Sequence, residues 1–388
     1  MLKKLLIACV VFCTGVAETR AQAKDYRIHG EIYTVMNTTV SGYIYWGRNL
    51  YWTDIFSASK PENPYTRYVN EVVPVAHQFA CRFGNIKRIR VIGDNRIELE
   101  IRDGHIIELE DWLPSGNRGS LRIEADKETA IAWDLISEIV FSAAPDTARE
   151  PADTPITGTV ETPHGRYTGI VQWDRDENSL SHVLDGRSGT SGITIAFKNI
   201  RSIASSGNSC QVVLNSGREF VLWGENDVDE RNRGIVVNMP SVGQVVVGWA
   251  DFKTFKSIPL NQVNLLKYSD FMSPRRIRGT VELKRGEVLE GVLVYDLDEA
   301  MDFELLDGRN GNVAYRIPFR NIRVIEPKNH KYTWLQLGNG GELVLGEERD
   351  VTFDNDGILV FDAKGAARYV RWRDVKRVSL PAKEEGNE

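Results

Sequence analysis

Acidic turns supply the residues of this chain that are best suited to bind a metal ion. The turns at residues 174–177 and 296–299 recur after an aromatic residue, and the loops at residues 226–232 and 350–356 are rich in side-chain oxygens. Calcium takes six to eight oxygen ligands, so alternating carboxylates favour it. The candidate calcium ligands are Asp227, Asp229, Asp354 and Asp356. The competing interpretation is a set of solvated turns, because Asp and Asn bond their own backbone and no EF-hand spacing is present.

Aromatic residues near the N-terminus form the second candidate site. Strand alternation places Tyr43 and Tyr45 on one face and Ile44 and Trp46 on the other. Trp46 has an aromatic counterpart later in the chain and is assigned to the core, whereas Tyr43, Tyr45 and Trp52 have none at aligned positions. A flat exposed aromatic patch suits a sugar ring or an apolar side chain of a partner. The alternative is that these three residues pack against the long loop that follows.

No catalytic constellation is recognisable in the sequence. The six histidines match no H-E-x-x-H motif, and there is no G-x-S-x-G elbow. Glycan hydrolysis needs a carboxylate pair at a defined separation, and nothing singles out one pair among the many carboxylates. We therefore expect a non-enzymatic protein with no catalytic residue, and keep a hydrolase with an unidentified site as an alternative.

An internal repeat organises the elements that must position these residues. A closing stretch with the pattern Phe-x-Asn-Ile-x-x-Ile begins at Phe83, Phe197 and Phe319. Looser versions, with the pattern aromatic-x-x-apolar-x-x-apolar, begin at Trp133, Trp249 and Trp372. Apolar–polar alternation between glycine-containing turns predicts short β-strands throughout, without helical periodicity. The recurring aromatic and apolar positions indicate elements that close a hydrophobic core.

The repeat also predicts the domain boundaries. We expect a signal peptide at 1–23, a first repeat at 24–141 with an insertion at 47–82, a linker at 142–155, a second repeat at 156–258, a partly apolar and packed linker at 259–274, a third repeat at 275–380 and a polar tail at 381–388. Each repeat contains two β-modules. The insertion is unique to the first repeat, so specialisation is expected there.

The closing turn followed by an apolar final strand resembles the SH3-like and Sm-like small β-barrels. This resemblance implies an all-β chain of three tandem repeats, each a pair of small barrels. Bacterial SH3-like modules bind cell-wall peptide or glycan or act as adaptors, so it also implies a binding role. The Sm-type RNA-binding residues are not recognisable here. The alternative fold is a six-bladed β-propeller with one half-repeat per blade, although a linker after every second half favours tandem barrels.

The N-terminus predicts export. Lys3 and Lys4 precede an apolar run at residues 5–16, and Ala21-Gln22-Ala23 is a cleavage signal. The alternative is lipoprotein processing with anchoring at Cys9. No later stretch is long and apolar enough to span a membrane.

Composition limits the partners. Net charge is −6 at pH 7, which argues against a generally basic nucleic-acid-binding surface. Cys81 and Cys210 lie in different repeats, so two isolated buried thiols are expected, with a disulfide as the alternative.

Together these patterns predict an exported envelope or periplasmic protein that binds or scaffolds protein or glycan partners through multivalent β-modules. A carbohydrate-binding protein that uses Tyr43, Tyr45 and Trp52 is the first alternative, and a hydrolase is the second. No cofactor is expected apart from calcium, and the oligomeric state is left open.

Overall fold

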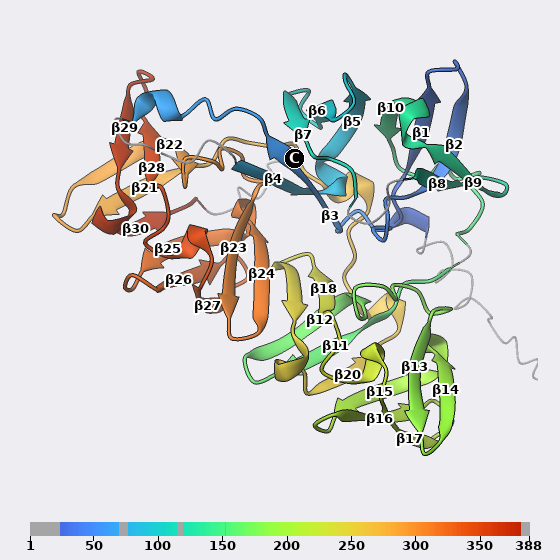
Figure 1. Ribbon diagram of the computed structural model, residues 1–388. Coiled ribbons are helices and arrows are strands. Elements are labelled where there is room, and N and C mark those ends of the chain that lie inside the picture. Colours follow the sequence, from blue (N-terminus) through green and yellow to red (C-terminus); the bar gives the residue numbers. More distant parts are fainter. Residues whose placement is uncertain (1–23, 70–76, 115–118, 152, 382–388) are drawn as a thin grey trace, which may run out of the picture.

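The computed structural model describes residues 24–69, 77–114, 119–151 and 153–381 (Figure 1). The predicted signal peptide, Cys9 and residues 382–388 of the predicted tail lie outside this part. Within it the chain forms thirty β-strands joined by turns and short 3-10 helices, which confirms the all-β prediction. None of its helices is long and apolar enough to cross a membrane.

The strands fall into three groups of ten, called units 1, 2 and 3. Unit 1 contains β1 (His29–Thr34), β2 (Thr39–Tyr45), β3 (Ile55–Lys60), β4 (His77–Arg82), β5 (Ile86–Val91), β6 (Arg96–Ile101), β7 (Ile106–Glu110), β8 (Ser120–Glu124), β9 (Glu128–Ala132) and β10 (Ile136–Phe141). Unit 2 contains β11 (Thr157–Thr162), β12 (Gly165–Gln172), β13 (Val183–Ser188), β14 (Ser191–Ala196), β15 (Ile200–Ser205), β16 (Ser209–Leu214), β17 (Glu219–Trp223), β18 (Ile235–Met239), β19 (Gly243–Val247) and β20 (Thr254–Ser257). Unit 3 contains β21 (Arg278–Leu283), β22 (Val288–Tyr295), β23 (Leu305–Asn310), β24 (Val313–Pro318), β25 (Ile322–Pro327), β26 (Tyr332–Leu337), β27 (Glu342–Gly346), β28 (Ile358–Phe361), β29 (Ala367–Val370) and β30 (Val375–Ser379).

Each unit pairs its strands in the same antiparallel order. Unit 1 reads β4-β3-β7-β6-β5-β10-β1-β2-β8-β9. The strand pairs of unit 2 give β14-β13-β17-β16-β15-β20-β11-β12-β18-β19. Those of unit 3 give β24-β23-β27-β26-β25-β30-β21-β22-β28-β29. One further pair, β19 with β24, joins units 2 and 3.

This order differs from the predicted fold in two ways. The sheets stay open and are not closed into barrels, because the end strands of each unit do not pair with each other. Each opening hairpin, such as β1-β2, pairs with two of the last three strands of its unit, here β10 and β8, and not with the strands that follow it directly. The propeller alternative also fails, because the thirty strands form two hydrogen-bonded sheets and not six blades.

Paired glycines explain the recurring opening of each unit. Gly158 in β11 lies opposite Gly169 in β12, and the same cross-strand pair occurs in units 1 and 3. A Cβ atom on Gly169 would lie 2.0 Å from the carbonyl oxygen of Asn238 in β18. Glycine is therefore required here by the close approach of a third strand.

The closing stretches are core elements, as their pattern indicates. In each one the aromatic residue begins a 3-10 turn and is buried, and a strand follows. The six turns are η2 (Phe83–Asn85), η3 (Trp133–Leu135), η4 (Phe197–Asn199), η6 (Trp249–Asp251), η9 (Phe319–Asn321) and η11 (Trp372–Asp374). Units 2 and 3 share one continuous hydrophobic cluster, while unit 1 forms another.

The segment between units 2 and 3 packs against unit 1. Phe271 is buried and lies against Gly84 at the start of the unit 1 closing stretch. The rings of Tyr268 and Trp52 have centroids 4.5 Å apart. Residues 259–274 therefore contribute side chains to the core of unit 1.

The insertion of the first repeat reaches across to unit 3. After β3 the chain runs to η1 (Thr66–Tyr68), which lies beside β29 in Figure 1. Lys60 Nζ lies 2.8 Å from Asp298 and 2.7 Å from Glu304, and the ring of Tyr68 is 5.3 Å from that of Phe361. The described part of the insertion thus connects units 1 and 3.

Candidate functional site

The predicted aromatic site is not an exposed surface. Tyr43 is 3% exposed and Trp52 is fully buried, while Tyr45 is half-buried. The Tyr43 hydroxyl donates to the backbone oxygen of Arg149 at 3.0 Å, and Tyr45 donates to Glu124. Tyr43 and Trp52 thus offer no ring face to a ligand, and Arg149 and Glu124 lie outside the long loop against which packing was expected.

Tyr43 and Tyr45 instead surround a buried arginine that the sequence did not single out. The guanidinium carbon of Arg27 lies 6.0 Å from the ring centroid of Tyr43, 5.0 Å from that of Tyr45 and 5.7 Å from that of Tyr51. Arg27 is 1% exposed, and no carboxylate of the described residues forms an ion pair with its guanidinium. Contact with three aromatic faces stabilises the cation in place of an ion pair.

The four predicted calcium ligands do not gather at one place. Asp229 is bound by Arg231 at 2.7 Å, Asp354 is exposed, and Asp356 pairs with Arg349. Only Asp227 joins other carboxylates, namely Asp174 and Glu177.

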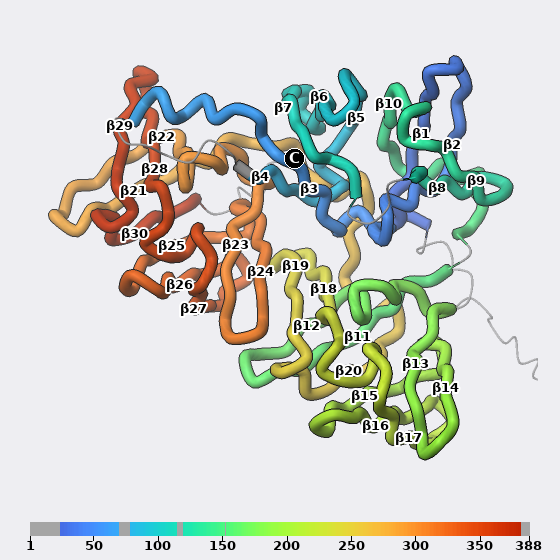
Figure 2. The backbone as a smooth tube through the Cα atoms, in the orientation of Figure 1, coloured from blue at the N-terminus to red at the C-terminus, as the bar shows by residue number. Residues whose placement is uncertain are grey.

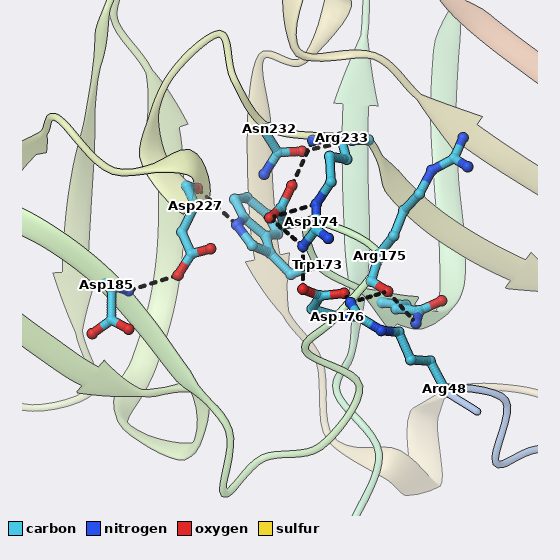
Figure 3. Close-up of polar contacts among 11 residues, drawn as sticks. Arg48, Trp173, Asp174, Arg175, Asp176, Asp185, Asp227, Asn232 and Arg233 are labelled. Carbon is cyan, nitrogen blue, oxygen red and sulfur yellow. Dashed lines mark hydrogen bonds and ion pairs between the residues drawn. The ribbon is translucent and has the colours of Figure 1, made fainter. Parts of the chain in front are cut away.

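Asp174, Glu177 and Asp227, called the acidic cluster, bring together two loops that the sequence marked separately. Their carboxylate oxygens lie within 4.8 Å of one another. Figure 3 shows how Asp227 is held: its backbone oxygen accepts from Trp173 Nε1 at 2.8 Å, and its Oδ2 accepts from the amide of Asp185 at 2.7 Å. The guanidinium of Arg233 binds Asp174 at 2.7 Å. Tertiary folding thus places these carboxylates together and pairs Asp174 with a guanidinium.

Burial and mutual repulsion raise the pKa values of carboxyl groups in the acidic cluster. Desolvation, followed by the charge of Asp227, raises the pKa of Glu177 to about 8. Desolvation also raises the pKa of Asp227 to about 6, although the bond from the amide of Asp185 opposes it. Arg233 is only a partial counter-charge for the cluster.

A cavity of about 760 Å³, called the central cavity, lies where unit 1 meets units 2 and 3. Figure 2 shows unit 1 seated across the junction of β19 and β24. The polar residues that line the cavity are Arg48, Asn49, Ser57, Ser59, Gln78, Asp111, Arg122, Gln172, Arg175, Gln244 and Arg316. Four arginines thus face one carboxylate. A cavity of this size, with convergent polar groups from several elements, is typical of a ligand site.

Arg175 carries the least compensated charge of the central cavity. Arg48 pairs with Asp176, Arg122 lies 3.2 Å from Glu128, and Arg316 lies 3.6 Å from Asp307. The guanidinium of Arg175 forms no ion pair or hydrogen bond with the residues that the structure describes. Desolvation, then repulsion from Arg316, Arg233 and Arg309, lowers its pKa. An anion beside Arg175 would relieve this repulsion.

The turn that carries Arg175 separates opposite charges. Asp174 and Arg175 both have left-handed backbone angles, with φ of 44° and 58°. Asp174 points into the acidic cluster, whereas the guanidinium of Arg175 extends away from it in Figure 3 and lines the central cavity. The sequence pattern predicted a role for the carboxylates of this turn but gave no indication of a role for Arg175.

Comparisons with protein-family models, with curated proteins and with solved structures find no match for this chain.

Proposed function

We propose that this protein is a non-enzymatic, exported binding protein whose central cavity holds an acidic, hydroxyl-rich ligand such as an acidic oligosaccharide. The observation that carries the proposal is Arg175, which lines the cavity and forms no ion pair with a described residue, whereas the three other lining arginines each have a carboxylate partner. Guanidinium groups bind carboxylates with strong, often bidentate hydrogen bonds.

The remaining lining groups suit the hydroxyls of such a ligand. Gln78, Gln172 and Gln244 come from three strands in two units and bring amide groups to the same space. An amide both donates and accepts, as a sugar hydroxyl does. Because units 1, 2 and 3 all contribute to the wall, we expect one shared site per chain in place of several separate module faces.

The geometry favours the other functions less. Burial of Tyr43 and Trp52 removes the stacking platform on which an aromatic carbohydrate site would depend. A hydrolase could draw on the acidic cluster, whose pKa values are shifted. The central cavity, however, is lined by none of those three carboxylates, and Asp111 is its one acid. Hydrolysis by a carboxylate pair needs two carboxyl groups beside the substrate.

Calorimetric titration tests the proposal with a uronic-acid oligosaccharide and the neutral oligosaccharide of the same length. We expect the acidic oligosaccharide to bind more tightly, and its affinity to fall as salt screens the arginines. Arg175→Gln removes one charged hydrogen-bond donor, worth about 1.5–3 kcal/mol, so affinity should fall about 10- to 150-fold.

Arg218→Gln is the matched control, because Arg218 is an exposed arginine of unit 2 that lies over the ring of Phe220 outside the cavity. Its affinity should equal that of the wild type. Equal binding of the acidic and neutral oligosaccharides, or an unchanged affinity in Arg175→Gln, would contradict the proposal.

A further inference from the structure

The acidic cluster of unit 2 has a counterpart in unit 3. The matching carboxylates are Asp174 and Asp296, Glu177 and Glu299, and Asp227 and Asp350. Strand pairing supports this match, because Trp173 bridges to Glu177 as Tyr295 bridges to Glu299.

The surroundings of Asp227 and Asp350 also match. The Oδ2 atom of Asp350 accepts from the amide of Asp307 at 2.7 Å, as that of Asp227 does from Asp185. The backbone oxygen of Asp350 accepts from the Tyr295 hydroxyl at 2.7 Å, in place of the tryptophan in unit 2. Asp227 and Asp350 are therefore held by matching bonds, although among the described residues the three carboxylates converge to within 4.8 Å of one another in unit 2 alone.

One arginine accompanies each set of three carboxylates. Arg233 binds Asp174 at 2.7 Å, and Arg349 binds Asp296 at 3.0 Å. Lys60 lies near the unit 3 set, but it pairs with Asp298 and Glu304. Each arginine is shared with a fourth carboxylate, Asp176 in unit 2 and Asp356 in unit 3, so the carboxylates around each set outnumber the arginines that bind them.

A buried carboxylate without a partner points to a missing cation. Glu299 is 8% exposed, and its Oε2 accepts no hydrogen bond from any described residue. It lines a pocket of about 250 Å³ together with Asp296 and Asp350. The Oε2 atom of Glu177 in unit 2 is also buried and unpartnered, although the residue as a whole is half-buried. Burying an ionised carboxylate without a counter-charge is costly, so such groups are normally paired or coordinate a metal.

We propose that units 2 and 3 each bind one calcium ion. The ligands are Asp174, Glu177 and Asp227 in unit 2 and Asp296, Glu299 and Asp350 in unit 3. All of these donors are carboxylate oxygens, which suit hard cations such as calcium and not the softer metals that prefer His or Cys. The unit 2 ion binds on the opposite side of its turn from the central cavity, because Asp174 and Arg175 point in opposite directions, whereas the unit 3 pocket shares Gln78 and Arg316 with that cavity.

Unit 1 provides an internal contrast. At the corresponding turn Trp46 bridges to Asn49, and Gly47 follows Trp46 where the other units have aspartate. Gly47 and Asn49 thus stand where the other units have two of the three carboxylates. We therefore expect no calcium ion at this turn of unit 1.

Calorimetric titration of the full chain with calcium, after treatment with a chelator, tests the assignment. We expect two calcium ions per chain. Glu177→Gln and Glu299→Gln should each lose one of them, with at least tenfold weaker binding at the altered site. Asp229→Asn is the matched control, because Asp229 lies in the same loop as Asp227 but is bound by Arg231, and it should keep both ions.

Thermal unfolding gives a second readout that also shows whether each variant folds. Calcium should raise the melting temperature of the wild type, and the rise should be smaller in each glutamine variant because one calcium ligand is lost. Absence of saturable calcium binding, or two ions retained in both glutamine variants, would overturn the proposal. A single ion lost in only one of these variants would overturn the assignment in the other unit.

Discussion

Replacing Gly169 by alanine tests why each unit opens with a pair of glycines. A Cβ atom at this position would lie 2.0 Å from the carbonyl oxygen of Asn238 and 2.9 Å from its carbonyl carbon. Both atoms belong to the backbone of the neighbouring strand β18, so no side-chain rotation can relieve the contact. Strands β12 and β18 must separate, and overpacking of this kind costs about 1–3 kcal/mol. We expect the upper end of this range, because the atoms that must move are hydrogen-bonded backbone.

Gly192→Ala is the matched control within the same unit. Gly192 lies in β14, is exposed, and a Cβ atom there would meet nothing within 4 Å. Its free energy of unfolding should stay within about 0.5 kcal/mol of the wild type. Calorimetry should show Gly169→Ala melting several degrees lower, at roughly 2–4 °C for each kcal/mol. If Gly169→Ala melts no lower than Gly192→Ala, close strand approach does not explain the repeated glycines.

Three further outcomes follow from buried groups. Lys60→Met should lower the free energy of unfolding in urea by about 3–5 kcal/mol, because it leaves Asp298 and Glu304, two largely buried carboxylates, without their cation. An unchanged urea midpoint would show that this ion-pair bridge between units 1 and 3 contributes nothing to stability. Desolvation raises the pKa of Asp54 to about 6, so the folded state binds this proton more tightly than the unfolded state does. The free energy of unfolding should therefore fall by roughly 3 kcal/mol as pH rises from about 4 to 7. Asp54→Asn should not show this fall. Burial raises the pKa of the Cys210 thiol to about 12 and that of Cys81 well above its usual range, so a thiol reagent should label both only after unfolding, and rapid labelling of the folded protein would refute their burial.

Local patterns in the sequence predict the strands and the core of this protein. Alternation and glycine-containing turns indicate an all-β chain, and the closing stretches at Phe83, Phe197 and Phe319 are buried turns that lead into strands. These features follow from sequence because a residue's preference for a turn or a buried face depends on its near neighbours.

The partners of the strands do not follow from the same patterns. The opening hairpin β1-β2 pairs with β10 and β8, which lie near the other end of the unit in sequence. Many strands have a similar alternation, and others, such as β18 and β28, begin with a run of consecutive apolar residues, so many pairings satisfy these patterns equally well. Only the packing of the whole unit selects among them, and this is why sequential closed barrels were predicted where open sheets with exchanged hairpins form.

The candidate site shows the same division. The sequence by itself determined that residues 174–177 and 226–232 are acidic loops and that Tyr43 and Tyr45 share a strand face. Tertiary structure decided that Asp227 meets Asp174 while Asp229 does not, and that the tyrosines surround Arg27. It also decided that Arg175 lines a cavity built from all three units. The physical reason is that burial and charge balance depend on neighbours from distant parts of the chain, which no local spacing encodes.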